Sequence, residues 1–263
     1  MFKTTLAAAL TVALLSGGAQ AQTTPAVPTA KSASGATIPA APAVVAAAAA
    51  SMADCTQTAD RAKALTACTA VLKDAGKDYP KIASAYTARA AAQDAAGKPK
   101  DALSDLTRAL VADPKNADLW TKRADVRAKL GQRIRSAADY SVALKYDPKK
   151  LSALLGRGDM YRQLGILPKA ITDATEALKL DPKSASAYAN RAYALVRSSK
   201  DADAVKDADE AIKLDAKSVQ AYLARGIAKM KSDKTAATAD IKKALELDPK
   251  STIAASVLKQ LGG

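Results

Sequence analysis

Leu178-Lys179-Leu180-Asp181-Pro182 is one of five similar stretches that recur along the chain. The others begin at Leu110, Leu144, Ile212 and Leu245, so that the first four lie 34 residues apart and the last follows after 33. Four of the five end in proline. The residue before a proline is pushed out of the helical region, so each Asp-Pro is expected to end a helix. A fixed period of this length indicates an array of stacked repeats.

Each period holds two helical stretches. Apolar and small residues recur at helical spacing, as at Ala102, Leu106 and Ala109. Gly97, Gly131 and Gly165 fall between the two stretches, where a residue with positive φ ends a helix. The sequence therefore predicts a helical hairpin in each period, whose first helix we call helix A and whose second we call helix B.

This period and pattern resemble the tetratricopeptide repeat family over residues 81–261. The family's large helix A residue falls on Tyr86, Trp120, Leu154, Tyr188 and Tyr222, and its small residue four positions later falls on Ala90, Ala124, Gly158, Ala192 and Gly226. A bulky helix B position holds Leu106, Tyr140 and Ile241, but Ala174 and Ala208 depart from it. The resemblance implies an all-α fold, an α-solenoid of about five helix-turn-helix repeats whose stacking creates an extended concave surface.

Both ends of the array differ from the internal repeats. Residues 54–80 contain one helix B pattern, from Ala64 to Leu72, whose partner helix A is degenerate, so we expect an N-terminal half-repeat. A last helix over residues 251–261 is expected to cap the array, with Ile253, Val257, Leu258 and Leu261 turned inward.

The first residues read as an export signal. Lys3, an apolar run from Leu6 to Leu15 and the small residues of Ala19-Gln20-Ala21 have the layout of a secretory signal peptide, over residues 1–21 with cleavage after Ala21. The run is too short to span a membrane, so no stable membrane insertion is expected. We expect an exported, periplasmic protein. Residues 22–53 carry one charge and are rich in Ala and Pro, which predicts a disordered leader.

The two cysteines, Cys55 and Cys68, favour a disulfide in an oxidising compartment. One continuous helix would hold their Cα atoms about 20 Å apart, so a bridge requires Cys55 to fold back along the helix that starts near Asp60. The alternative is two independent buried thiols.

The composition offers little for catalysis. The chain of 263 residues has no histidine and two cysteines, which excludes Ser-His-Asp and Cys-His pairs and a four-cysteine zinc site. We expect no enzyme activity, no catalytic residues, no cofactor and no metal. The formal charge of +14 comes mostly from scattered lysines without interleaved aromatics, so nucleic acid is not the expected partner, and weak attraction to anionic surfaces remains open.

Arginine and aspartate recur in phase. Arginine stands at residues 89, 123, 157, 191 and 225, and aspartate at residues 105, 139, 173, 207 and 240. One interpretation is an arginine stripe that binds a polyanion. We favour internal pairing, because carboxylates at the same period would already occupy each guanidinium.

Helix A positions that face away from the core form the groove in tetratricopeptide proteins. The resemblance places a peptide-binding groove at Asp125, Asp159, Arg162, Asn190, Tyr193, Leu223 and Ile227. The same rows of groove positions also contain Thr87, Ala91, Asp94, Thr121, Ala128, Leu155, Ala189, Val196 and Met230. The function implied is a non-enzymatic scaffold in the bacterial periplasm that binds another envelope protein or a peptide segment. The alternative is a binding module for anionic envelope polymers or membrane surfaces, which would use the lysine-rich exterior.

Overall fold

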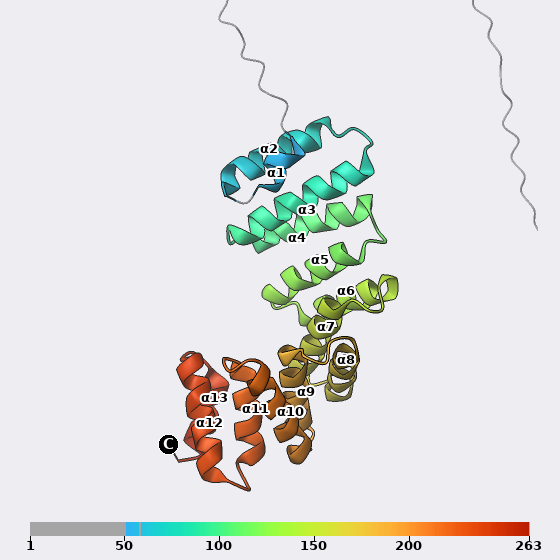
Figure 1. Ribbon diagram of the computed structural model, residues 1–263. Helices are drawn as coiled ribbons and strands as arrows, with labels where there is room; N and C mark the ends of the chain where they lie inside the picture. Colours follow the sequence, from blue (N-terminus) through green and yellow to red (C-terminus); the bar gives the residue numbers. More distant parts are fainter. Residues whose placement is uncertain (1–50, 58, 263) are drawn as a thin grey trace, which may run out of the picture. The chain divides into compact units, whose positions relative to one another are not determined.

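The structure is a computed structural model that describes residues 51–57 and 59–262, and within them the chain forms thirteen helices and no strand. The helices stack in chain order (Figure 1). Their bounds are α1 Met52–Thr56, α2 Arg61–Asp74, α3 Tyr79–Ala95, α4 Pro99–Ala112, α5 Ala117–Lys129, α6 Arg133–Tyr146, α7 Leu151–Gln163, α8 Leu167–Leu180, α9 Ala185–Arg197, α10 Asp201–Leu214, α11 Val219–Lys229, α12 Lys234–Leu247 and α13 Thr252–Gln260. The predicted all-α solenoid is confirmed.

From α3 to α12 the odd-numbered helices are the A helices and the even-numbered ones are the B helices. Each A helix packs on the B helix that follows it, and each B helix packs on the next A helix. Gly97, Gly131 and Gly165 have φ values of +74°, +71° and +75° and end three A helices as expected. In the fourth hairpin Ser199 takes this place with a φ of +58°. The aspartate of each repeated stretch is the C-cap of a B helix, as at Asp113 and Asp181.

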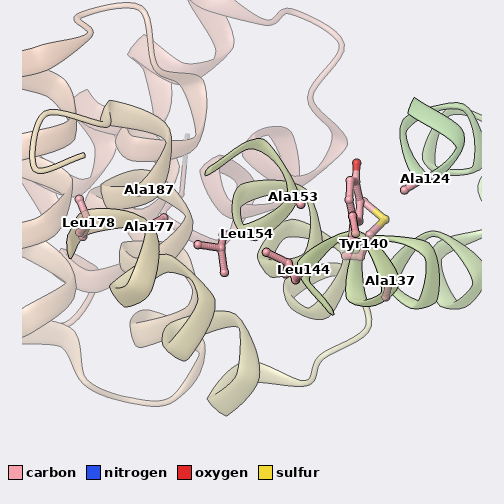
Figure 2. Close-up of a cluster of buried hydrophobic side chains, with 11 residues drawn as sticks. Ala124, Ala137, Tyr140, Leu144, Ala153, Leu154, Ala177, Leu178 and Ala187 are labelled. Atoms are coloured by element: carbon pink, nitrogen blue, oxygen red, sulfur yellow. The ribbon is translucent and has the colours of Figure 1, made fainter. Parts of the chain in front are cut away.

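The core is built from alanine and a few larger side chains. In the central cluster Tyr140, Leu144 and Leu154 fill the space between alanines of α5 to α9, such as Ala124 and Ala177 (Figure 2). Alanine lets the helix backbones approach closely, so that each hairpin buries its apolar face against its neighbours.

The in-phase arginines and aspartates form buried ion pairs. In all five hairpins the arginine Nε and one Nη donate to the two carboxylate oxygens of the aspartate, with donor–acceptor distances of 2.6–2.9 Å. The aspartate side chains are 2–11% exposed. The hydrogen bond to the aspartate raises the pKa of four of these arginines, Arg89, Arg157, Arg191 and Arg225. The guanidinium groups are therefore occupied, as the internal-pairing interpretation requires.

Each arginine also reaches the preceding hairpin or half-repeat. The remaining Nη of Arg89 donates to Thr69 Oγ1 of α2 at 3.1 Å. The equivalent acceptors of the other four are Thr107, Ser141, Thr175 and Asp209. One arginine thus joins three helices, of which two belong to its own hairpin.

The N-terminal end contains a helix that the sequence analysis did not expect. Ser51 and Asp54 form a capping box that starts α1, so residues 51–53 belong to the beginning of a helix and not to a leader. The short helix folds back on α2, and Cys55 and Cys68 form a disulfide with a Cα–Cα distance of 4.5 Å. The predicted signal peptide (residues 1–21) and the rest of the predicted leader (residues 22–50) lie outside the described residues.

The C-terminal helix α13 packs on α12. Its buried residues are Ala254, Val257 and, just beyond its end, Leu261. Ile253 is 47% exposed, so the prediction that it faces inward was wrong. Its neighbour Ala254 takes the inward position, because Ala254, Val257 and Leu261 follow one another at helical spacing on one face.

Candidate functional site

A pocket lies between α3 and α5, two neighbouring A helices that do not pack closely together. The other A helices contact their A-helix neighbours directly (α5 with α7, α7 with α9 and α9 with α11), whereas α3 and α5 make little direct contact. The space between them is a cavity of about 620 Å³ that is also bordered by α1, and we call it the α3–α5 pocket. Its volume lies within the range of about 300–1,000 Å³ that is usual for ligand sites.

Small side chains of α3 create this space. Ala88, Ala91, Ala92 and Ala95 line the α3 side of the pocket, and Leu119 contributes apolar surface from α5. Because each of these four side chains is only a methyl group, the space between α3 and α5 stays open. The lining is accordingly mostly apolar.

Polar groups stand among the apolar ones. Gln57 and Arg61 lie on the side of the pocket formed by α1 and α2, and Asn116, Asp118 and Lys122 lie on the α5 side. Asn116 is the N-cap of α5, where its side chain accepts hydrogen bonds from two backbone amides. An apolar surface with a few polar groups suits a peptide, whose backbone needs hydrogen-bond partners when it leaves water.

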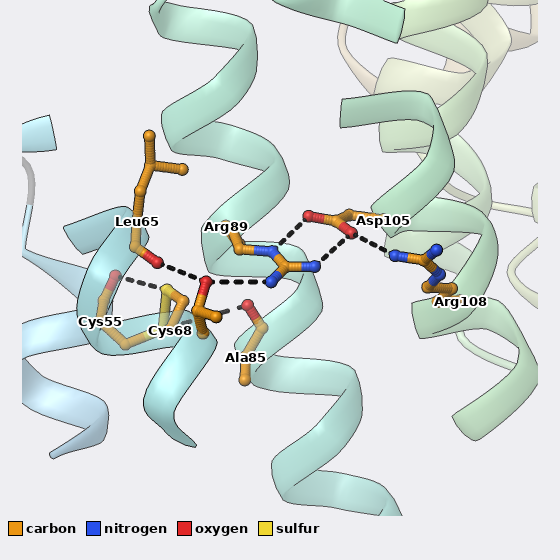
Figure 3. Close-up of polar contacts among 8 residues, drawn as sticks. Cys55, Leu65, Cys68, Ala85, Arg89, Asp105 and Arg108 are labelled. Carbon is orange, nitrogen blue, oxygen red and sulfur yellow. Dashed lines mark hydrogen bonds and ion pairs between the residues drawn. A yellow bond between two sulfur atoms is a disulfide. The ribbon is translucent and has the colours of Figure 1, made fainter. Parts of the chain in front are cut away.

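The wall formed by α1 is held in place covalently. The disulfide ties α1 to α2, and both cysteines are at most 1% exposed. Cys55 Sγ lies 3.9 Å from the carbonyl oxygen of Ala85 in α3, a van der Waals contact because a disulfide sulfur carries no proton to donate (Figure 3). The bridge therefore fixes α1 against both α2 and α3.

The pocket continues into a second hollow of about 170 Å³. The two share Thr87, Ala91 and Lys122, and the second hollow adds Asp94, Asp125 and Lys129. Lys129 Nζ lies 2.5 Å from Asp94 Oδ2 and so links α5 to α3 across this hollow. The two hollows therefore lie side by side between these helices.

Asp125 lines the second hollow. Its carboxylate accepts a hydrogen bond from the Tyr140 hydroxyl at 2.5 Å, and Tyr140 itself is 3% exposed. Although the Asp125 residue is exposed as a whole, partial burial of its carboxyl raises its pKa, and the bond from Tyr140 opposes this rise. Burial and the neighbouring Asp125 raise the pKa of Tyr140. Tyr140 therefore stays protonated and donates to Asp125.

Asp159, Arg162 and Tyr193 come together in the centre of the array. Arg162 Nε donates to Asp159 Oδ1 at 3.0 Å within α7, and its guanidinium stacks over the Tyr193 ring of α9 at 4.9 Å. Tyr193 is 5% exposed and packs against Ala208, one of the two positions where the repeat pattern lacks a bulky residue.

The remaining sequence-predicted site residues lie toward the C-terminal end. Asn190 Oδ1 accepts a hydrogen bond from Gln220 Nε2 at 2.8 Å, which links α9 to α11. Leu223 is 6% exposed and packs with Ile241, and Ile227 is half-buried. Leu223 and Ile227 therefore contribute more to packing than to an open surface.

Sequence reasoning placed Thr87 and Ala91 in the groove rows without singling them out, and it missed Gln57, Asn116 and Lys122. The available signal was the row of alanines at residues 88, 91, 92 and 95 on one side of a helix A. The part contributed by α1 could not be inferred, because it depends on how the disulfide folds that short helix back.

Among the described helices, none is long and apolar enough to cross a membrane. The described part of the chain also contains no group of three or more His, Cys, Asp or Glu side chains placed to hold a metal ion.

These features define a class of protein, an α-solenoid of helical hairpins with a pocket between two of its A helices. The family model described as "TPR repeat" matches residues 158–199. Four further hairpins surround or overlap that match, and they carry the arginine–aspartate pair at the same positions. Tetratricopeptide arrays generally act as protein-interaction scaffolds.

Solved structures support the same fold. The chain is 17% identical to YrrB, described as a TPR protein with an unusual peptide-binding site, with a TM-score of 0.58 over 74% of this chain and 99% of that one. It is 19% identical to MamA from Desulfovibrio magneticus RS-1, with a TM-score of 0.58 over 65% and 97% of the two chains. A tetratricopeptide repeat protein from Parabacteroides merdae shares 20% identity, with a TM-score of 0.55 over 78% and 93%. No curated protein matches the sequence.

Proposed function

We propose that this protein is an exported, non-enzymatic scaffold that binds a peptide segment of another envelope protein along its A helices. The observation that carries the proposal is the α3–α5 pocket, an open and mostly apolar cavity of about 620 Å³ on the groove side of the array. The structural neighbour YrrB, described as having a peptide-binding site, adds support.

The proposed groove runs from this pocket past Asp125 toward Asp159, Arg162 and Asn190. Tyr193, Leu223 and Ile227 would support it from beneath rather than supply most of its surface, since the first two are nearly fully buried. An extended segment would place apolar side chains against the alanines and Leu119, and its backbone carbonyl oxygens would accept hydrogen bonds from Arg61 and Lys122. Extended peptides commonly bind through such a combination of side-chain pockets and backbone hydrogen bonds.

Photo-crosslinking in the native envelope tests the proposal. A photo-crosslinking residue at Thr87, inside the α3–α5 pocket, is expected to capture a discrete protein. The matched control is Thr172 of α8, an exposed threonine whose hydroxyl bonds only within its own helix. Capture at both positions, or at Thr172 alone, would contradict recognition by the groove.

A substitution in the pocket provides a second test. Ala91→Glu places a charged side chain in the apolar space between α3 and α5, at a position that is itself exposed and so tolerates the change in the free protein. Partner capture through Thr87 is expected to fall at least tenfold, because a desolvated carboxylate costs more than about 1.4 kcal/mol. Unchanged capture in a folded variant would place the binding surface elsewhere.

The alternative is binding to anionic polymers or membrane surfaces through the lysine-rich exterior. The formal charge of +14 is the observation that favours it. The two functions are expected to differ in how strongly salt weakens binding.

A further inference from the structure

Two neighbouring hairpin turns expose apolar side chains among cations. Ile134, at the start of α6, is 73% exposed, and the arginines on either side of it are exposed as well. The turn between α7 and α8 adds two partly or fully exposed apolar residues and an exposed lysine. We call this set the arginine–isoleucine edge, and its members are Arg133, Ile134, Arg135, Leu164, Ile166 and Lys169.

The two turns lie side by side. Arg133 Nε donates to Gln163 Oε1 at 2.7 Å, which ties the start of α6 to the end of α7. A hollow of about 370 Å³ lies between the turns, lined by residues 131–135 on one side and by Leu164 on the other. The arginines and the apolar residues therefore belong to one surface.

The two turns carry positive charge without acidic neighbours in the sequence. Residues 127–135 and 160–169 contain no Asp or Glu. Two other hairpins have an aspartate at the position of Arg135, namely Asp101 and Asp203. The arginine–isoleucine edge therefore has a cation where those hairpins have a carboxylate.

The residues beneath the edge add to its positive charge. Asp139 already pairs with both Arg123 and Arg127, at 2.8 and 2.7 Å. Burial lowers the pKa of Arg127, the pairing with Asp139 opposes this, and the nearby Arg123 and Arg135 lower the pKa further. Arg127 Nε is buried and has no hydrogen-bond partner within the described residues. An anionic surface at this edge would therefore meet cations that the chain itself neutralises only in part.

A lipid surface suits this combination better than a peptide does. A peptide needs a groove that buries its side chains, whereas Ile134 itself is exposed on a turn. An exposed isoleucine is able to enter the interfacial region of a bilayer, while neighbouring arginines bind the phosphates of anionic lipids. Arginine fits this role because its guanidinium offers two parallel donors to a phosphate.

We propose that the arginine–isoleucine edge docks on a bilayer surface that contains anionic lipid, with Ile134 entering the interface between Arg133 and Arg135. This peripheral contact goes beyond the proposed function, because it is a second surface that does not depend on the α3–α5 pocket. It also differs from attraction through the lysine-rich exterior as a whole. Helix α6 has 14 residues and is about 21 Å long, so cations at its other end lie beyond the screening length of about 8 Å and contribute little.

Vesicle flotation tests the docking, with residues 22–263, the chain expected after cleavage of the signal peptide. The protein is expected to float with phosphatidylcholine vesicles that contain about one third phosphatidylglycerol, and not with phosphatidylcholine alone. Arg133→Gln with Arg135→Gln is expected to weaken binding about 25-fold, because each arginine near an anionic surface contributes about fivefold. The matched control is Lys149→Gln with Lys183→Gln, which removes the same charge from exposed positions just beyond the opposite ends of α6 and α8. The control is expected to change binding less than about twofold.

A second pair of variants tests the apolar part of the edge. Ile134→Ser is expected to weaken binding to the same vesicles about tenfold, because the burial of the isoleucine side chain in the interface is lost. Val111→Ser is the control and is expected to leave binding unchanged, since Val111 is 80% exposed but lies near the C-terminal end of α4. The substituted side chains are all exposed, so each variant should keep the urea midpoint of the parent protein.

Four results would overturn the proposal. The first is the absence of flotation with the anionic vesicles. The second is an equal loss of binding in the arginine and lysine variants, which would show that charge acts from the whole exterior. The third is unchanged binding of Ile134→Ser. The fourth is binding of soluble polyglutamate, weakened by the arginine variant, without binding of vesicles, which would make an acidic protein segment the occupant of the edge.

Partner capture at Thr87 distinguishes this inference from the proposed function. The double variant at Arg133 and Arg135 is expected to keep that capture while it loses the vesicles. If a partner is captured at Thr87 but no vesicle binds, only the inference fails. If vesicles bind through the edge and no partner is ever captured, the scaffold function fails and the docking stands.

Discussion

Tyr140 reaches the groove side of the array because residue 156 has no side chain. A Cβ atom at Gly156 would lie 2.3 Å from the ring of Tyr140, which is closer than any real contact. The ring therefore lies against the α7 backbone, and its hydroxyl meets Asp125 of α5. One glycine thus allows a helix B side chain to place a donor beside the groove.

This arrangement predicts that Gly156→Ala destabilises the fold. Overpacking of this kind costs about 1–3 kcal/mol, of which the better helix propensity of alanine offsets up to about 1 kcal/mol. In a Tyr140→Ala background the clash is absent, so the same substitution is expected to be neutral or stabilising. Urea unfolding of the four proteins of this double-mutant cycle measures the coupling, and additive effects would show that the ring does not contact Gly156.

Ser199 has a backbone conformation that glycine adopts without strain. Its φ of +58° matches the three glycines at the same position of earlier hairpins. Ser199→Gly is expected to increase the free energy of unfolding by about 1 kcal/mol, because a side chain in this region is sterically disfavoured. Ser198→Gly is the control, since Ser198 has a φ of −99° and gains nothing from glycine. Chemical denaturation of both variants checks the difference.

At the scale of the helix, α1 depends on its disulfide. Five residues are too few for a stable isolated helix, so the bridge to α2 and the contacts with α3 must hold it. Reduction, or Cys55→Ser with Cys68→Ser, is expected to lower the free energy of unfolding by about 3 kcal/mol. Hydrogen exchange should then show loss of protection in α1 and α2 first, whereas unchanged protection there would mean that packing alone holds the wall of the α3–α5 pocket.

Two ion pairs that involve α8 are expected to contribute very different amounts to the free energy of unfolding. Asp173 is 5% exposed and accepts both hydrogen bonds from Arg157, whereas Glu176 is 48% exposed and pairs with Lys179. Asp173→Ala is expected to cost about 3–5 kcal/mol, because it leaves a buried guanidinium without its partner. Glu176→Ala is expected to cost at most about 1 kcal/mol. Thermal or urea unfolding measures both, and similar costs would show that the buried pair is not a special constraint.

Much of this element-level organisation could be predicted from the sequence. The repeated Asp-Pro stretches, the glycines at positive φ and the arginine–aspartate pairs all depend on residues a fixed distance apart, so the period alone aligns them. The burial of Tyr193 was harder to predict, because it depends on small residues of other helices, such as Ala208, that lie in the same buried cluster. The α3–α5 pocket was harder still to predict. It exists because four alanines of α3 have side chains too small to fill the space, and because the disulfide holds the short helix α1 beside it.

At the scale of the whole molecule, the two candidate functions respond differently to salt. Binding to a polyanion through many lysines should weaken by orders of magnitude between about 50 and 200 mM salt, because bound counterions are released. Binding through the apolar α3–α5 pocket should change little, since hydrophobic contacts are not screened. Partner retention on the immobilised protein at the two salt concentrations measures this, and a steep loss would favour the charged exterior.

The arginine that joins three helices also makes the array directional. Each arginine extends to the hairpin or half-repeat before it, so a hairpin is complete only when its N-terminal neighbour is present. The ribosome delivers the chain in that same order, with the N-terminal part first. Each hairpin that reaches the compartment where the protein folds therefore finds its acceptor residues already present, and the array is able to assemble from its N-terminal end without waiting for its C-terminus.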